Sequence, residues 1–270
     1  MLPVILCHGI CRFDIISHGI ETILSTLRPI DDDSFNYFRK IKSTLRNAFP
    51  DIRVYEPNVS WAGTVRQRAM DLNAFIQANL QPGERFHIIG HSMGGLDARH
   101  LIYDFQNIEM HKRVASINTI STPHNGTPFA DWGLRNLQEL IKLSQILHFD
   151  INGFRDLTTT ACKQFNVQSD MFERLSGVKI RTYAGVQDVN KTFLLLRPAW
   201  NIIEPVEGPN DGLVSLKSAK YKDEYFIKQI TADHLNECGW WDVNDGFDFA
   251  IEQQAQNLYV DIMRDIALMQ

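Results

Sequence analysis

The sequence lacks the features that mark several classes of protein. No run of about 18 or more apolar residues occurs in its 270 residues, so we expect no transmembrane segment. No block of basic residues is present and the net charge is −5, which argues against nucleic acid as a partner. Internal repeats and low-complexity segments are also missing. The remaining composition is typical of one large globular domain with a sizeable core.

Cysteine is scarce, and the few cysteines suggest neither a disulfide framework nor a metal site. They are Cys7, Cys11, Cys162 and Cys238. Cys7 and Cys11 flank a His-Gly turn, but no second pair with zinc spacing follows them. His87 and His91 stand beside Glu84, yet they fall on an expected strand and turn, not on one helix face. We therefore predict no metal ligands and no cofactor.

The amino terminus also lacks a targeting signal. The first three residues lead directly into an apolar strand, without a charged leader region or a cleavage site. A chain of this kind is expected to stay in the cytoplasm. The alternative is a secreted protein whose leader is not part of the given sequence.

Strand and helix patterns alternate along the chain. Strands are expected over 2–7, 52–56, 85–89, 114–120, 178–186 and 224–230, and helices over 35–49, 64–80, 93–106, 131–148 and 247–268. This alternation predicts an α/β fold, with a mostly parallel central sheet flanked by helices on both faces. No linker divides the chain, so we treat residues 1–270 as a single domain.

The segment RFHIIGHSMGGLDARH (85–100) carries the clearest chemical pattern. A short apolar run ends in G-x-S-x-G around Ser92, and a helical pattern follows at once. A serine nucleophile on a strand-to-helix elbow needs this arrangement, because the glycines let the two backbones approach closely. The first N–H groups of the helix then point at the reacting centre. The alternative is a serine that only caps the helix at a tight turn.

An activated serine needs a base, and the base needs an orienting acid. His234 is the last histidine of the chain and follows an expected strand, so we expect it to be the base unless it is a surface histidine. Asp211 is the leading acid, although Asn-Asp-Gly is also common turn chemistry. Asp188 remains a rival, because it also follows a strand. Asp233 is excluded, since adjacent side chains in extended structure point apart.

The reaction also needs donors for the developing oxyanion. The N–H of Met93, directly after the serine, is one expected donor. The second should come from the loop after an early strand, where the N–H of Ile10 is the natural candidate. We interpret His8 as a structural residue that holds this loop.

These residues resemble the bacterial family I triacylglycerol lipases, which have the α/β-hydrolase fold. The matching segments occur in the family's order and are PVILCHGI…FD (3–14), GHSMGGLDARH (90–100), STPHNGTPFAD (121–131), FN (165–166), NDGLVS (210–215) and DHLN (233–236). The resemblance implies Ser92 as nucleophile, Asp211 as acid and His234 as base. It also implies the N–H groups of Ile10 and Met93 as oxyanion donors.

Two features of that family are not matched. Many of its members hold a structural calcium near the catalytic histidine, but Asn236 replaces the expected aspartate and Trp240 the expected glutamine. A neutral amide is a weaker ligand for a hard cation, so we predict no calcium requirement. The segment DVNDGFD (242–248) fails the EF-hand spacing. The family's disulfide finds no clear match in Cys162 or Cys238.

Residues 124–177 interrupt the alternation and are predicted to form an inserted helical lid or cap over the sheet. The segment 131–148 has an apolar face formed by Leu134, Leu137, Leu140, Ile141, Leu143, Ile146 and Leu147. This face covers more than half of a helical wheel, whereas a helix packed on one side needs a stripe of roughly 100°. The excess could face an acyl chain or a lipid surface. The alternative is a helix packed between two layers.

The leading functional hypothesis is a triacylglycerol lipase or carboxylesterase that cleaves acyl esters through an acyl-enzyme on Ser92. An acyl-thioesterase or a phospholipase would use the same three residues. A catalytically silent binding protein is a third possibility, although an intact serine, acid and histidine in the right order argue against it. The expected partners are an acyl ester or lipid substrate and a transient lipid surface.

Overall fold

The computed structural model describes residues 1–270 except 11–32, 34–35, 62, 148–150, 243–248 and 269–270. The side chains at 140, 143–144, 146–147 and 249 also lie outside the description.

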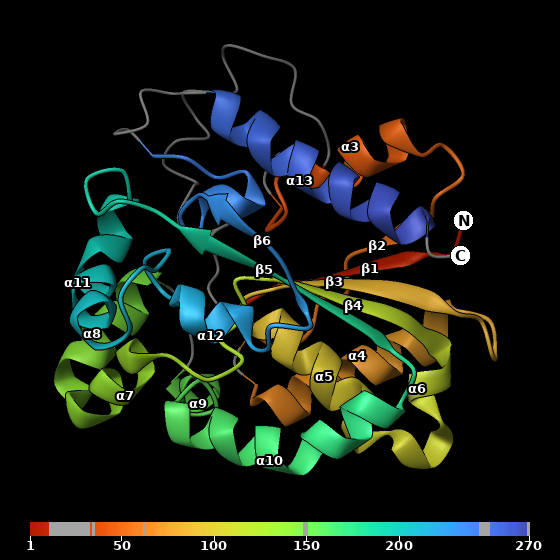
Figure 1. The fold of residues 1–270 in the computed structure, drawn as a ribbon, viewed down its shortest axis with the longest axis horizontal. Coiled ribbons are helices and arrows are strands. Elements are labelled where there is room, and N and C mark those ends of the chain that lie inside the picture. The colour runs from red at the N-terminus through yellow and green to blue at the C-terminus, as the bar shows by residue number, and fades with distance from the viewer. Residues whose placement is uncertain (11–32, 34–35, 62, 148–150, 243–248, 269–270) are drawn as a thin grey trace.

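A single parallel sheet of six strands forms the centre of the molecule (Figure 1). Its strands are β1 (Val4–Cys7), β2 (Val54–Tyr55), β3 (Phe86–His91), β4 (Val114–Ile120), β5 (Lys179–Val186) and β6 (Phe226–Thr231). Their order across the sheet is β2-β1-β3-β4-β5-β6, and every neighbouring pair is parallel. All six expected strands are therefore present, and the sheet is parallel throughout.

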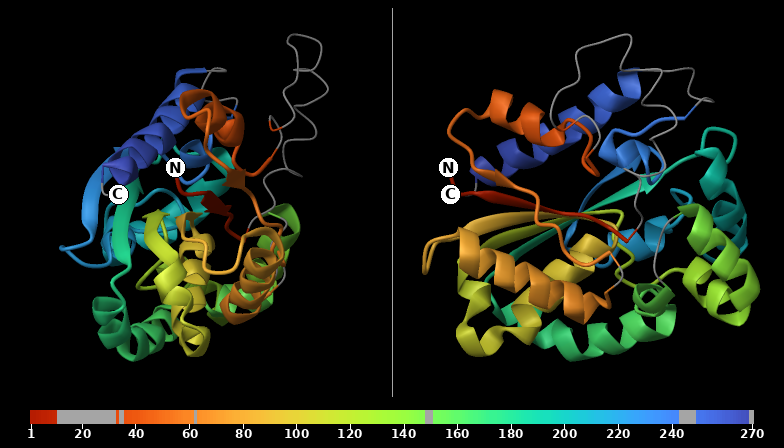
Figure 2. Two further views of the ribbon diagram at one scale, coloured as in Figure 1. Left: turned by 90° about the vertical axis from the view of Figure 1, so that its right-hand side faces the viewer. Right: turned by 180° about the vertical axis from the view of Figure 1, so that it is seen from behind.

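Helices cover both faces of the sheet, as Figures 1 and 2 show. One face is covered by α3 (Ile41–Ala48) and α13 (Phe249–Ala267), and the other by α4 (Val65–Asn79), α5 (Met93–Asp104) and α6 (Met110–Arg113). Alternate residues of β1 enter the two cores: Val4 and Leu6 belong to one apolar cluster, Ile5 and Cys7 to the other. Because β1 is buried on both faces, its sequence is a continuous run of apolar residues.

The insertion over 124–177, expected to hold one long helix over 131–148, contains several helices instead. It contains α7 (Pro128–Arg135), α8 (Leu137–Leu147), α9 (Ile151–Arg155) and α10 (Thr159–Leu175). The single helix over 131–148 is wrong, because the chain breaks at Asn136, whose side-chain amide and backbone N–H both donate to the carbonyl of Trp132. The three consecutive threonines at 158–160 mark the start of α10, since the Thr158 hydroxyl accepts from the N–H of Ala161.

The remaining elements are short. Among the described residues they are α11 (Arg197–Glu207), α12 (Leu216–Lys220) and the 3₁₀ turns η1 (Gln106–Ile108), η2 (Leu194–Leu196) and η3 (Asn236–Cys238). The helix expected over 35–49 begins only at Ile41, because Lys40 before it takes a left-handed conformation. Across the described parts of the chain, none of the helices is both long and apolar enough to cross a membrane.

Candidate catalytic site

Ser92 lies at the turn between β3 and α5 in a strained backbone conformation. Its φ of 57° and ψ of −132° are rare for a residue with a side chain. Its backbone is held on both sides, since the N–H donates to the carbonyl of Ile120 and the carbonyl accepts from the hydroxyl of Thr122. This geometry matches the elbow predicted from the sequence.

The elbow depends on a close approach of two backbones. A Cβ atom on Gly94 would collide with the backbone carbonyl of Cys7, at the end of the neighbouring strand β1. A side chain at this position would push α5 away from the sheet. The glycine therefore lets α5 begin directly beside the end of β1, close to the loop that follows it.

His234 and Asp211 form a buried pair. The Nδ1 atom of His234 lies 2.7 Å from Oδ2 of Asp211, and both side chains are almost fully buried. The second carboxylate oxygen, Oδ1, accepts from the N–H groups of Leu213 and Val214. Because a carboxylate accepts, Nδ1 carries the hydrogen and Nε2 is free to act as a base. His234 follows β6, so it stands at the same edge of the sheet as Ser92.

Asp188 does not share this environment. Its side chain is exposed to solvent, and its backbone carbonyl accepts from Lys191 and Thr192 in a local turn. The structure thus brings Asp211, and not Asp188, to the histidine. No hydrogen bond joins Ser92 Oγ to His234 in the described structure, and such bonds are often long before substrate binds. The His234 ring lies 4.5 Å from the ring of His91, the residue just before Ser92.

The expected oxyanion donors flank the serine. Met93 is the first residue of α5, so its N–H has no acceptor within the helix. On the other side, the loop after β1 passes directly over Ser92. A Cβ atom on Gly9 would lie 2.8 Å from the Ser92 Cβ and 3.1 Å from its Oγ. Ile10 follows in this loop and is buried.

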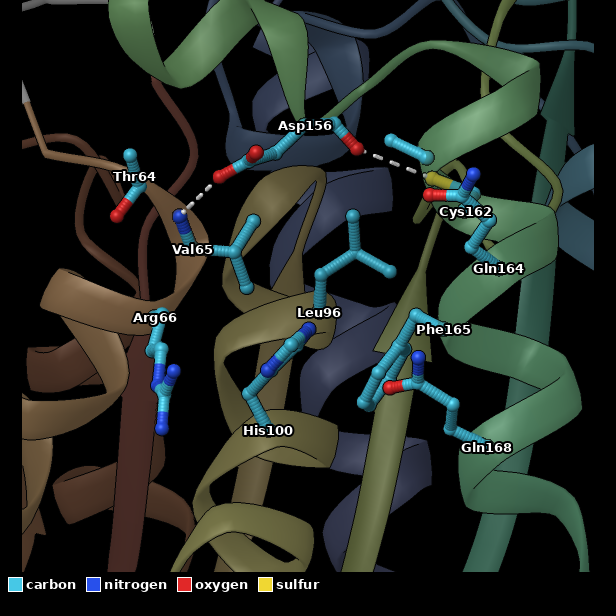
Figure 3. A pocket seen from close by; sticks show the side chains of 11 residues that line it. Thr64, Val65, Arg66, Leu96, His100, Asp156, Cys162, Gln164, Phe165 and Gln168 are labelled. Carbon is cyan, nitrogen blue, oxygen red and sulfur yellow. Dashed lines mark hydrogen bonds between the residues drawn. The ribbon is translucent and has the colours of Figure 1, made fainter.

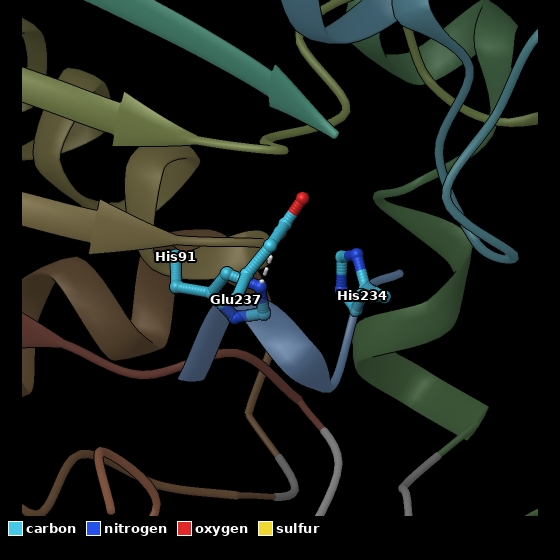
Figure 4. A group of neighbouring side chains, drawn as sticks. All are labelled: His91, His234 and Glu237. Carbon is cyan, nitrogen blue, oxygen red and sulfur yellow. Dashed lines mark hydrogen bonds and ion pairs between the residues drawn. The ribbon is translucent and has the colours of Figure 1, made fainter. Parts of the chain in front are cut away.

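A second carboxyl–imidazole pair, not predicted from the sequence, lies beside the first (Figure 4). Nε2 of His91 is 3.0 Å from Oε2 of Glu237, and Oε1 of Glu237 accepts from the hydroxyl of Ser121 at 2.6 Å. Nδ1 of His91 lies 2.7 Å from the hydroxyl of Tyr37. All of these groups are buried. The sequence signal was weak: Glu237 stands three residues after His234, one 3₁₀ turn along the chain.

Burial disfavours the charged form of both members of this second pair. It raises the pKa of Glu237 well above its ordinary value, and the nearby Asp211 carboxylate acts in the same direction. Burial also lowers the pKa of His91 well below its ordinary value. A protonated Glu237 can then donate to Nε2 of a neutral His91.

Few of the described side chains are grouped in a way that could bind a metal ion. His91, His234 and Glu237 form the one group of three potential ligands found among them, but Nε2 of His91 and Oε2 of Glu237 are paired with each other, and Nδ1 of His234 with Asp211. At the family's calcium position, the Asn236 amide donates to the carbonyl of Trp240 and accepts from the N–H of Asp233. These residues do not fit a calcium ion. The segment 242–248, apart from its first residue, lies outside the described residues.

The described cysteines are all buried free thiols. Cys7, Cys162 and Cys238 form no disulfide with one another. Cys11, the remaining cysteine, lies outside the described residues.

Figure 3 shows a cavity of about 370 Å³ in another part of the molecule, lined by none of the three proposed catalytic residues. It is bordered by the start of α4, by α5 and by α10, and its polar rim includes Arg66, His100 and Asp156. The Asp156 carboxylate accepts from the N–H of Val65 at 2.8 Å. Neither the serine nor the histidine–aspartate pair lines this cavity. We therefore do not assign the reacting ester group to it.

Several known proteins are similar to this chain in sequence. The sequence profile of the PGAP1-like alpha/beta domain matches residues 60–186. Triacylglycerol lipase 2 of Saccharomyces cerevisiae is 29% identical over 88% of this chain and 80% of its own length. A lipase of Staphylococcus epidermidis is 23% identical over 89% of the chain, but the match spans only 48% of that lipase.

Solved structures show the same fold. The lipase of Staphylococcus hyicus superposes with a TM-score of 0.66 at 20% identity, over 100% of this chain and 97% of its own. A metagenomic carboxyl esterase superposes with a TM-score of 0.72 at 14% identity, over 100% of this chain and 76% of its own. With its six-stranded parallel sheet, the chain has a lipase-like α/β-hydrolase fold.

Proposed function

We propose that this chain is a serine hydrolase that cleaves the acyl esters of lipids, with triacylglycerols as its substrates. It is an enzyme, a carboxylic ester hydrolase, in keeping with the names of its relatives in yeast and staphylococci. Its kinship with the bacterial family I lipases remains part of the proposal. The observation that carries it is the buried Asp211–His234 pair at the same sheet edge as a strained Ser92.

The proposed reaction follows from the roles of these three residues. Ser92 Oγ attacks the ester carbonyl carbon, and its proton passes to Nε2 of His234. The Asp211 carboxylate stabilises the imidazolium through Nδ1. When the carbon–oxygen bond to the alcohol breaks, His234 returns the proton to the leaving alcohol. Water then hydrolyses the acyl-enzyme by the same route in reverse.

The negative charge that develops on the carbonyl oxygen is assigned to two backbone donors. These are the N–H groups of Ile10, in the loop after β1, and of Met93, the first residue of α5. The N–H of Met93 is fixed by the start of α5 before substrate binds, which is what electrostatic preorganisation requires.

Part of the insertion over 124–177 is proposed to act as a lid. Ser92 is only 7% exposed and His234 only 1%, which supports a movement that admits the ester. Leu137 and Ile141 of α8 are 51% and 45% exposed, and exposed apolar side chains of this size favour contact with a lipid surface. Leu140, Leu143, Ile146 and Leu147, which complete the expected apolar face, have side chains outside the described residues.

The test is a hydrolysis profile over esters of increasing chain length, below and above their solubility. A triacylglycerol lipase should hydrolyse emulsified long-chain glycerides and gain rate above the solubility limit. A carboxylesterase would prefer short soluble esters and show no gain. The control is Ser92→Ala, together with labelling by a serine-directed phosphonate. A parent protein that hydrolyses no ester and is not labelled at Ser92 would be the silent binding protein.

A further inference from the structure

Two consecutive peptide groups of the loop after β1 are each held by a side chain. Nδ1 of His8 lies 2.8 Å from the carbonyl oxygen of Gly9. Because a carbonyl oxygen can only accept, Nδ1 must carry the hydrogen and donate it. One peptide earlier, the guanidinium of Arg68 donates to the carbonyl oxygen of His8 at 2.5 Å.

The first of these bonds determines where the Ile10 N–H points. The carbonyl of Gly9 and the N–H of Ile10 belong to the same peptide group, and no cis peptide bond occurs in the described structure. In a trans peptide the carbonyl and the N–H point in opposite directions. A ring that holds the Gly9 carbonyl on one side therefore directs the Ile10 N–H to the other side.

We propose that His8 is a positioning residue for the oxyanion hole: its Nδ1–H holds the Gly9 carbonyl, so that the Ile10 N–H faces the oxyanion formed on Ser92. This inference rests on the proposed function, because it assigns a purpose to the Ile10 N–H in ester hydrolysis. Glycine at position 9 makes such a restraint necessary. Without a Cβ atom, the peptide plane beside it can adopt several orientations at little cost.

The His8 ring is itself immobilised. It is buried and stacks on the indole of Trp61, with ring centroids 3.7 Å apart and planes inclined by 19°. The indole nitrogen of Trp61 donates to the side chain of Asn58. A stacked ring has little freedom to rotate, so Nδ1 keeps its place beside the Gly9 carbonyl.

Arg68 fixes the preceding peptide in a similar way. Its guanidinium is fully buried and forms three hydrogen bonds with the carboxylate of Asp97 on α5, at 2.7–3.1 Å. Since Asp97 stands on the helix that begins beside Ser92, the loop and the nucleophile share one rigid support. The Ile10 N–H could turn away from Ser92 only if the Arg68–Asp97 pair moved or if the hydrogen bond from His8 to the Gly9 carbonyl broke.

The test compares three variants that differ in where they place an N–H donor. Asparagine places its amide nitrogen at the position of Nδ1, whereas glutamine places it nearer to Nε2. Kinetics are measured on a short soluble ester and normalised to active sites titrated with a phosphonate. His8→Ala and His8→Gln should lower kcat on the order of 100-fold, as loss of an oxyanion donor does, with little change in KM. His8→Asn should stay within about threefold of the parent, because the donor is retained.

A purely structural role for His8 would give a different pattern. The Asn and Gln variants would then lose activity equally, or would differ only in the fraction of titratable sites and in melting temperature. Either result, or a fully active His8→Ala, would overturn the inference. If His8→Ala does not fold, the Asn–Gln pair still decides. An unlabelled Ser92 in the parent would overturn the proposed function itself, and the inference with it.

Discussion

The insertion over 124–177 contains two helices that are attached to the molecule in different ways. Helix α10 is held by a buried charge network around Arg99, a fully buried residue of α5. Arg99 pairs with Glu173 at 2.8 Å and donates to the side chains of Asn166 and Ser169, all three on α10. The aromatic rings of Phe165 and Tyr221 also lie against its guanidinium.

Helix α8 has a different kind of attachment. The helices that it chiefly contacts are its chain neighbours α7 and α9. Its exposed apolar residues, Leu137 and Ile141, contrast with the buried polar contacts of α10. The sequence analysis treated the whole insertion as one lid or cap, but its two helices differ in how they are attached. We interpret α10 as a fixed part of the hydrolase core and α8 as the segment able to move.

Breaking the anchor of α10 should have the largest effect on stability. Arg99→Met leaves Glu173 buried without its partner, which is expected to lower the free energy of unfolding by about 3–5 kcal/mol. Urea unfolding measures this loss, and ester hydrolysis should fall in parallel. Arg174→Met, which removes an exposed ion pair of the same helix, is the matched control and should leave the unfolding midpoint unchanged. Equal midpoints for parent and Arg99→Met would show that α10 is not anchored there.

A charge on α8 should instead change substrate preference without changing stability. Leu137→Asp is expected to lower the ratio of long-chain to short-chain hydrolysis by about tenfold, since its apolar contact with a lipid surface is lost. Rates on an emulsified and a soluble ester give this ratio. Gln138→Asp, with the same charge at an exposed polar position, is the control. An unchanged ratio in Leu137→Asp would contradict the lid proposal.

Acid should weaken the anchored region through His124. Burial lowers the pKa of His124 well below its usual value, and the Arg99 charge acts in the same direction. The unfolded chain then binds the proton more tightly than the folded one. The stabilisation is therefore complete above about pH 6.5 and is lost as pH falls, by at most about 1.4 kcal/mol per pH unit. His124→Gln should make this slope shallower in urea unfolding measured from pH 5 to 7.5, and the contribution of His91, whose pKa is also lowered, should remain. An equally steep slope in the variant would show that another group is responsible.

Removing divalent cations should have the smallest effect on either region. Hydrogen bonds from Asn236 to Trp240 and from Leu194 to Asp242 already hold the loops around His234 together. Dialysis against a chelator should thus change neither the melting temperature nor the rate. A loss that calcium restores would show that other oxygens build a calcium site.

Most of the fold could be predicted from the sequence, because buried strands appear as short apolar runs and the elbow as a G-x-S-x-G motif. Helix α10 was not found, since Val167, Met171 and Leu175 place apolar residues on its exposed face and obscure the inward stripe. Helix α11 was missed as well. It contains a proline near each end, which the sequence suggests are breaks.

The residues of the site could be predicted only where they belong to short sequence motifs. Ser92, Asp211 and His234 each stand in a segment with turn or elbow chemistry. The pair formed by His91 and Glu237 joins positions 146 residues apart, and no local pattern predicts such a contact. Its burial depends on the packing of the whole sheet edge.

The pairing of Asp211 with His234 is the centre of this account, and one comparison of two variants tests it most directly. Asp211→Asn and Asp188→Asn are assayed on a soluble ester, with active sites titrated and melting temperatures recorded. Asp211→Asn should lower kcat by about 10⁴-fold, because an amide cannot stabilise the imidazolium, while Asp188→Asn should match the parent. A fully active Asp211→Asn, or an inactive and folded Asp188→Asn, would contradict the proposed triad.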